Sequence, residues 1–136
     1  MNCGRAVAVV GAALALAACD GGVGLVCPAV GWFDTLTVQL AEEWPDGEGR
    51  SVRLDCGGPC DPPVLSRDPS RLTAAWEGST ARFTVGMSVP DSVEVTVLGP
   101  DGAVLAELDA DPDWGRVGGS VECGGPHEAT VIVPAP

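Results

Sequence analysis

The stretch VEVTVLGPDGAVLAEL, residues 93–108, contains the clearest strand pattern of the chain. Apolar residues recur at every second position in both of its halves, which is typical of strands that bury one face. Between the halves, residues 99–102 place Pro at the second position of a turn and Gly at the fourth. That order matches a type I turn that closes into a β-bulge. The stretch therefore predicts a β-hairpin.

The same two-residue period recurs along the rest of the chain, and no helical period of useful length follows residue 18. Turn-forming segments separate the alternating runs, which lie at 32–40, 51–56, 72–76, 81–87 and 128–133. This pattern predicts an all-β domain over residues 27–136, an antiparallel β-sandwich of about seven short strands, immunoglobulin-like or transthyretin-like. Phe83 and Val95 fall on the apolar sides of their runs and are predicted to be in the core.

Two connections have compositions that exclude regular structure. The acidic segment 41–50 contains Pro and Gly, and we expect it to turn the chain so that the first two strands form a hairpin. Segment 57–70 holds four prolines and two glycines, so its backbone cannot sustain a ladder of hydrogen bonds. It is predicted to be an irregular surface loop.

Residues 1–18 have the three parts of a secretory leader: a positive charge at Arg5, an apolar core, and small residues at the end. The core is too short to cross a bilayer, which needs about 20 apolar residues. The sequence LAAC at 16–19 resembles the lipobox of bacterial lipoproteins, in which the thiol is lipidated and the chain is cut just before it. Ordinary secretion is the alternative, because residues 15–17 also fit the small-x-small cleavage rule.

The lipobox resemblance implies that Cys19 is the mature N-terminus and carries a diacylglycerol with further acyl chains such as palmitate. Two or more chains on one residue give stable membrane attachment, whereas one chain is marginal. Residues 19–26 are rich in Gly and predict a short flexible tether between the lipid and the domain.

As a whole the chain resembles small lipoproteins of actinobacteria. The features that carry this resemblance are the lipobox, the segment CPAVGW at 27–32, the loop from Cys56 to Cys60, and the segment ECGGPHE at 122–128. The resemblance implies an exported domain anchored by Cys19 at the extracytoplasmic face of the cell membrane. It implies no activity.

The charge of the chain limits its partners. Cleavage before Cys19 removes one of the seven basic residues and none of the nineteen acidic ones, so the formal charge changes from −12 to −13. Nucleic acid is excluded as a partner, because its phosphates require a basic surface. The same charge repels anionic lipids, so we expect the domain to stand off the membrane beyond its anchor.

Four cysteines remain once Cys3 is removed with the leader and Cys19 is lipidated. An even number outside the cytosol predicts two disulfides, for which three pairings exist. If the first two strands form a hairpin, extending its register brings Cys27 nearer to Cys60 than to Cys56. The expected bridges are therefore Cys27–Cys60 and Cys56–Cys123.

A zinc site is the alternative to the disulfides. Cys56, Cys60, Cys123 and His127 together form a Cys3His set, which suits tetrahedral zinc. The spacing is looser than the usual C-x2-C knuckle, and Cys27 would be left unpaired in an oxidising compartment. We therefore favour the disulfides and expect no cofactor.

No recognisable catalytic motif is present in the sequence. A hydrolase triad needs a His between a nucleophile and a carboxylate, and His127 stands near no Ser in a recognisable nucleophile turn. Asp109, Asp111 and Asp113 alternate as in the opening of an EF-hand, but Trp114 stands where that loop requires Gly. The expectation is a non-enzymatic binding or structural module whose partner is an envelope protein or another envelope component.

Overall fold

The computed structural model describes residues 24–60 and 67–136. The leader, Cys19 and the start of the tether lie outside the described residues, as does the middle of the Pro-rich loop. The strands are β1 Asp34–Leu40, β2 Ser51–Asp55, β3 Arg71–Ala75, β4 Thr80–Val85, β5 Val93–Leu98, β6 Val104–Ala110, β7 Gly115–Arg116 and β8 His127–Val133. None of the described segments is a helix of the length and apolarity needed to span a membrane.

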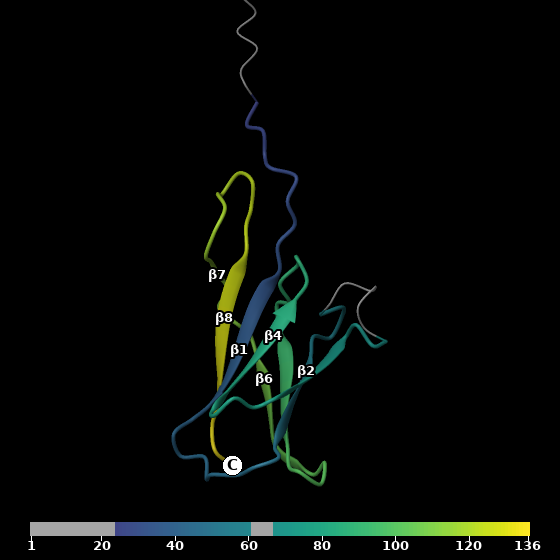
Figure 1. Ribbon diagram of the computed structural model, residues 1–136, viewed down its shortest axis with the longest axis vertical. Helices are drawn as coiled ribbons and strands as arrows, with labels where there is room; N and C mark the ends of the chain where they lie inside the picture. The colour runs from purple at the N-terminus through teal and green to yellow at the C-terminus, as the bar shows by residue number, and fades with distance from the viewer. Residues whose placement is uncertain (1–23, 61–66) are drawn as a thin grey trace, which may run out of the picture.

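The strands form two four-stranded sheets, with orders β4-β1-β8-β7 and β3-β2-β5-β6. Figure 1 shows β8, β1 and β4 side by side. All neighbouring strands are antiparallel except β1 and β8, which run parallel. The predicted all-β sandwich is confirmed, and its immunoglobulin-like or transthyretin-like type stays a prediction.

Alternating residues of the strands supply the core between the sheets. In β1 every second residue is buried, and β2, β4 and β8 follow the same period. Phe83 is 3% exposed and Val95 is fully buried, which confirms both as core residues. Burying one such side chain stabilises the fold by about 1.5–3 kcal/mol, so the two-residue period determines which face of each strand points inward.

The hairpin predicted at residues 93–108 is present as β5 and β6. The backbone N–H of Gly99 donates to the carbonyl of Ala103 at 2.8 Å, and that of Gly102 donates to the carbonyl of Gly99 at 3.0 Å. Gly102 has a φ of 80°, a conformation that Gly adopts without steric cost. The ladder shifts register between Val97 and Leu98, as expected for a turn that ends in a bulge.

The expected hairpin between the first two strands is wrong. β1 pairs with β4 and β8, whereas β2 pairs with β3 and β5, so segment 41–50 crosses from one sheet to the other. Both strands are buried on one face only, and this pattern does not distinguish a hairpin from two strands that face each other across the core. The described residues hold eight strands, in agreement with the expected number of about seven, and the shortest, β7, is two residues long.

Candidate functional site

The four cysteines form two disulfides, as the sequence predicts, but the expected pairing is wrong. Cys27 is bonded to Cys123, with their Cα atoms 5.3 Å apart, and Cys56 is bonded to Cys60, with 5.5 Å between Cα atoms. The predicted bridges Cys27–Cys60 and Cys56–Cys123 required β1 and β2 to be neighbours. Because β1 runs parallel to β8, the segments that precede these two strands lie together, and they carry Cys27 and Cys123.

The alternative zinc set is not assembled in this arrangement. Cys123 is bonded to Cys27, and Cys56 and Cys60 are bonded to each other, so none of the three offers a free thiolate. His127 directs Nδ1 toward Asp34. Across residues 24–60 and 67–136, no group of three or more His, Cys, Asp or Glu side chains is arranged to hold a metal ion.

Asp34 and His127 form a partly buried pair at the start of β1 and β8. The carboxylate of Asp34 is fully buried, and its Oδ1 accepts a hydrogen bond from the backbone N–H of His127 at 2.6 Å. Nδ1 of the His127 ring lies 3.3 Å from the same oxygen, while Oδ2 of Asp34 has no partner among the described residues. No described hydroxyl is hydrogen-bonded to His127, so the pair joins two strands and is not extended to a nucleophile.

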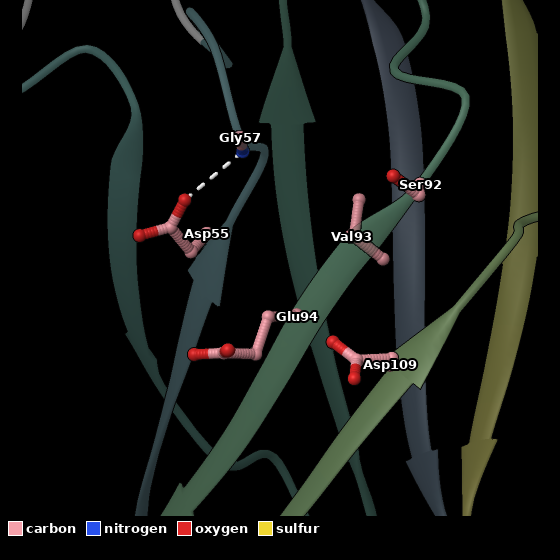
Figure 2. A pocket seen from close by; sticks show the side chains of 6 residues that line it. All are labelled: Asp55, Gly57, Ser92, Val93, Glu94 and Asp109. Atoms are coloured by element: carbon pink, nitrogen blue, oxygen red, sulfur yellow. Dashed lines mark hydrogen bonds between the residues drawn. The ribbon is translucent and has the colours of Figure 1, made fainter.

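Three carboxylates form a row across the outer face of the second sheet. Asp55 of β2 lies opposite Glu94 of β5, and Glu94 lies opposite Asp109 of β6. Residues that face each other across neighbouring strands point to the same side of a sheet. We call Asp55, Glu94 and Asp109 the acidic row. Figure 2 shows the three side chains on their neighbouring strands, beside a cavity of about 420 Å³.

Among the described residues, the acidic row makes one ion pair. Nη2 of Arg71, opposite Asp55 on β3, lies 3.1 Å from Oδ2 of Asp55, and the backbone N–H of Gly57 donates to Oδ1. The pKa of Asp68 is lowered by hydrogen bonds from the hydroxyl and backbone N–H of Ser70 and, to a smaller extent, by the charge of Arg71. Arg71 thus interacts with both Asp55 and Asp68. Within the described residues, no ion pair neutralises Glu94 or Asp109.

Sequence reasoning missed the acidic row because its members are spread over 55 positions, from 55 to 109. The alternation places Asp55 and Glu94 on outer faces, but only the strand register shows that they are neighbours. In the sequence, Asp109 alternates with Asp111 and Asp113, which suggests a turn rather than a strand. The structure instead places it at the end of β6, opposite Glu94.

A second surface feature extends beyond the strands where β1 and β8 begin. It consists of residues 24–33 and 117–126, which are joined by the Cys27–Cys123 disulfide. We call these two segments the tip. Figure 1 shows both of them above the labelled strands, at the end where the described part of the chain begins. Trp32, Gly124 and Pro126 help to line a cavity of about 300 Å³ in the tip.

Comparison of this chain with protein-family models, with curated proteins and with solved structures found no match to any of them.

Proposed function

We propose that this chain is an exported lipoprotein, held at the extracytoplasmic face of the cell membrane by a lipid on Cys19. The observation that carries the proposal is the disulfide bonding of all four cysteines in the described residues. Disulfides persist in oxidising compartments outside the cytosol. The proposed leader, residues 1–18, accounts for export, and Cys19, which completes the LAAC lipobox, accounts for the anchor. The two disulfides and the lipobox therefore support the same compartment.

Membrane fractionation of the expressed full chain tests the anchor. The wild-type chain is expected in the membrane fraction and in the detergent phase, and it should incorporate labelled palmitate. Cys19→Ser should lose the palmitate label while the domain still folds, because Cys19 takes no part in either disulfide. Cys3→Ser is the matched control and should retain the label. Equal labelling of wild type and Cys19→Ser would contradict the proposal.

Thiol counting separates the disulfide-bonded lipoprotein from the zinc alternative. The purified wild-type protein should show no reactive thiol without reductant, and chelator treatment should release none. Reactive thiols released by a chelator would instead indicate that Cys56, Cys60 and Cys123 hold a metal.

We also propose that the domain is a non-enzymatic binding module, and that it binds its partner through the acidic row. Like charges directly opposite each other in a sheet destabilise it, by about 0.2–1 kcal/mol for each pair. A row that keeps Glu94 and Asp109 side by side therefore weakens the fold and favours a role in binding over a structural one. Its charge fits a partner with positively charged groups, such as a basic segment of an envelope protein.

Binding of a synthetic lysine-rich peptide tests this assignment. We expect Glu94→Gln combined with Asp109→Asn to weaken peptide binding markedly at low salt. Glu42→Gln combined with Glu43→Gln removes the same charge from the β1–β2 connection and is the matched control, with little effect expected. Equal weakening by both double variants would mean that only net charge attracts the peptide, and the acidic row would lose its assignment.

A further inference from the structure

Exposed apolar side chains are concentrated in the tip. Of the ten large hydrophobic residues that are exposed in the described part of the chain, six belong to the tip: Leu25, Val26, Val30, Phe33, Val117 and Val121. Val26 is 90% exposed and Val121 is 81% exposed. Scattered single hydrophobic residues are normal on a surface, whereas a concentration in one place indicates an interaction site.

A disulfide, backbone hydrogen bonds and a packed Trp side chain hold the tip together. The Cys27–Cys123 disulfide joins its two segments. Within segment 117–126, the backbone N–H of Val117 donates to the carbonyl of Pro126 at 2.8 Å, and Ser120 donates to Gly124 at 3.0 Å. Trp32 packs closely on Gly124, where a Cβ atom would lie 2.9 Å from the indole ring. The disulfide and these contacts therefore hold the apolar residues of both segments at the same end of the sandwich (Figure 1).

The tip also differs from the rest of the chain in charge. Residues 24–33 include no charged side chain, and residues 117–126 include only Glu122. The whole chain has a formal charge of −12, so its negative charge lies almost entirely elsewhere. The repulsion from lipids that the net charge predicts is therefore weakest at the tip, because surface electrostatic interactions are screened within about 8–10 Å.

The tip lies close in the chain to Cys19, and this position indicates which surface the tip contacts. Cys19 precedes Gly24 by five residues, and an extended chain spans at most about 3.6 Å per residue, so the lipid-bearing residue lies within about 20 Å of the first described residue. We propose that the tip rests on the lipid bilayer and places Leu25, Val26 and Val121 among the headgroups. The inference rests on the proposed lipid anchor and specifies which surface of the domain faces the membrane.

Fluorescence quenching by brominated lipids tests this orientation. The full-length lipoprotein is reconstituted into phosphatidylcholine vesicles that carry bromine near the headgroup end of the acyl chains. Val121→Trp adds an indole at the tip, and Val104→Trp adds one at a site that is also exposed but lies at the other end of the sandwich, beside the β5–β6 turn. The emission that each variant adds to that of the wild type is then compared.

We expect the added emission of Val121→Trp to shift to the blue and to lose intensity in brominated vesicles, while that of Val104→Trp does neither. Bromine near the headgroups should quench more than bromine near the chain ends, since interfacial side chains enter only about 5–10 Å. If the added emission of Val121→Trp has the same intensity in brominated vesicles as in plain ones, as expected for Val104→Trp, the inference is overturned. A blue shift of Val121→Trp that rises with protein concentration without vesicles would also overturn it, because a second copy would then cover the tip.

Flotation of the same vesicles distinguishes failure of this inference from failure of the anchor. Protein that floats with the vesicles while Val121→Trp is not quenched leaves the lipoprotein assignment intact and removes only the orientation. If wild-type protein purified from the membrane fraction carries no lipid and does not float, the proposed anchor fails and the orientation fails with it.

Discussion

The tip and the acidic row lie at the same end of the sandwich, yet their chemistry is opposite. The tip extends the sheet β4-β1-β8-β7, is almost uncharged and is joined by a disulfide between residues 96 positions apart. The acidic row crosses the sheet β3-β2-β5-β6, and the disulfide beside it joins residues only four positions apart. Neighbouring surfaces of one small domain can thus face different partners, with the lipid proposed for the tip and a cationic group for the row.

The largest expected difference between the two regions concerns their disulfides. In the chain-entropy model a bridge stabilises more when it closes a longer loop, about 4.7 kcal/mol for the Cys27–Cys123 separation and about 2 kcal/mol for Cys56–Cys60. We therefore expect Cys27→Ala/Cys123→Ala to lower the free energy of unfolding by more than twice as much as Cys56→Ala/Cys60→Ala. Urea unfolding of the two double variants, with wild type as reference, measures this, and equal losses would contradict the entropic explanation.

The pairing of these cysteines also shows which features of the fold could not be predicted from the sequence. The β5–β6 hairpin was predictable because a local turn, Gly99 to Gly102, links strands that are adjacent in sequence. The positions of Phe83 and Val95 were predictable because the two-residue period determines which side chains point inward. Neither pattern carries information on which distant strands pair. The parallel pairing of β1 with β8 joins segments about 90 residues apart, and it brings Cys27 to Cys123.

Neither the acidic row nor the tip could be predicted from the sequence, and the reasons are related. The acidic row requires the register of three strands, and that register is set by long-range packing rather than by any local signal. The tip lies outside the strands, so strand periodicity does not describe it. One signal could have found it: residues 24–33 form an uncharged, largely apolar segment in a strongly acidic chain.

A second prediction compares a glycine of the tip with one beside the acidic row. Gly119 and Gly57 both have positive φ, 69° and 64°. A Cβ atom at Gly119 would overlap the carbonyl oxygen of Gly124, whereas one at Gly57 would have open space. We expect Gly57→Ala to cost about 1 kcal/mol through its backbone conformation alone, and Gly119→Ala to cost about 3 kcal/mol. Thermal unfolding of both variants checks the order, and a larger loss for Gly57→Ala would mean that Gly119 is not closely packed on Gly124 and Gly125.

The third prediction compares a fully buried aspartate at the base of the tip, Asp34, with a partly exposed one in the row, Asp55. Asp34→Ala leaves the backbone N–H of His127 without its acceptor, and an unsatisfied buried donor costs about 1–3 kcal/mol. Asp55→Ala removes an exposed ion pair with Arg71, worth about 0–1 kcal/mol, and relieves repulsion from Glu94. We expect a clear loss of stability for Asp34→Ala and almost none for Asp55→Ala in urea unfolding. Asp34→Asn keeps an acceptor oxygen and should be the milder change.

The smallest expected effect has the opposite sign. Glu94 lies between Asp55 and Asp109, and Arg71 offsets only the charge of Asp55. Glu94→Gln keeps the size of the side chain and removes repulsion on both sides, so it should raise the free energy of unfolding by about 0.5 kcal/mol at low salt. Because Glu94 is partly exposed to solvent, salt screens its repulsion from the two neighbours, and the gain should shrink as salt is added. Glu42→Gln, in the β1–β2 connection and outside the row, is the control and should change stability little. A loss of stability in Glu94→Gln at low salt would show that the Glu94 carboxylate makes a favourable interaction. The acidic row would then stabilise the fold, and the proposal that it is kept for binding would fail.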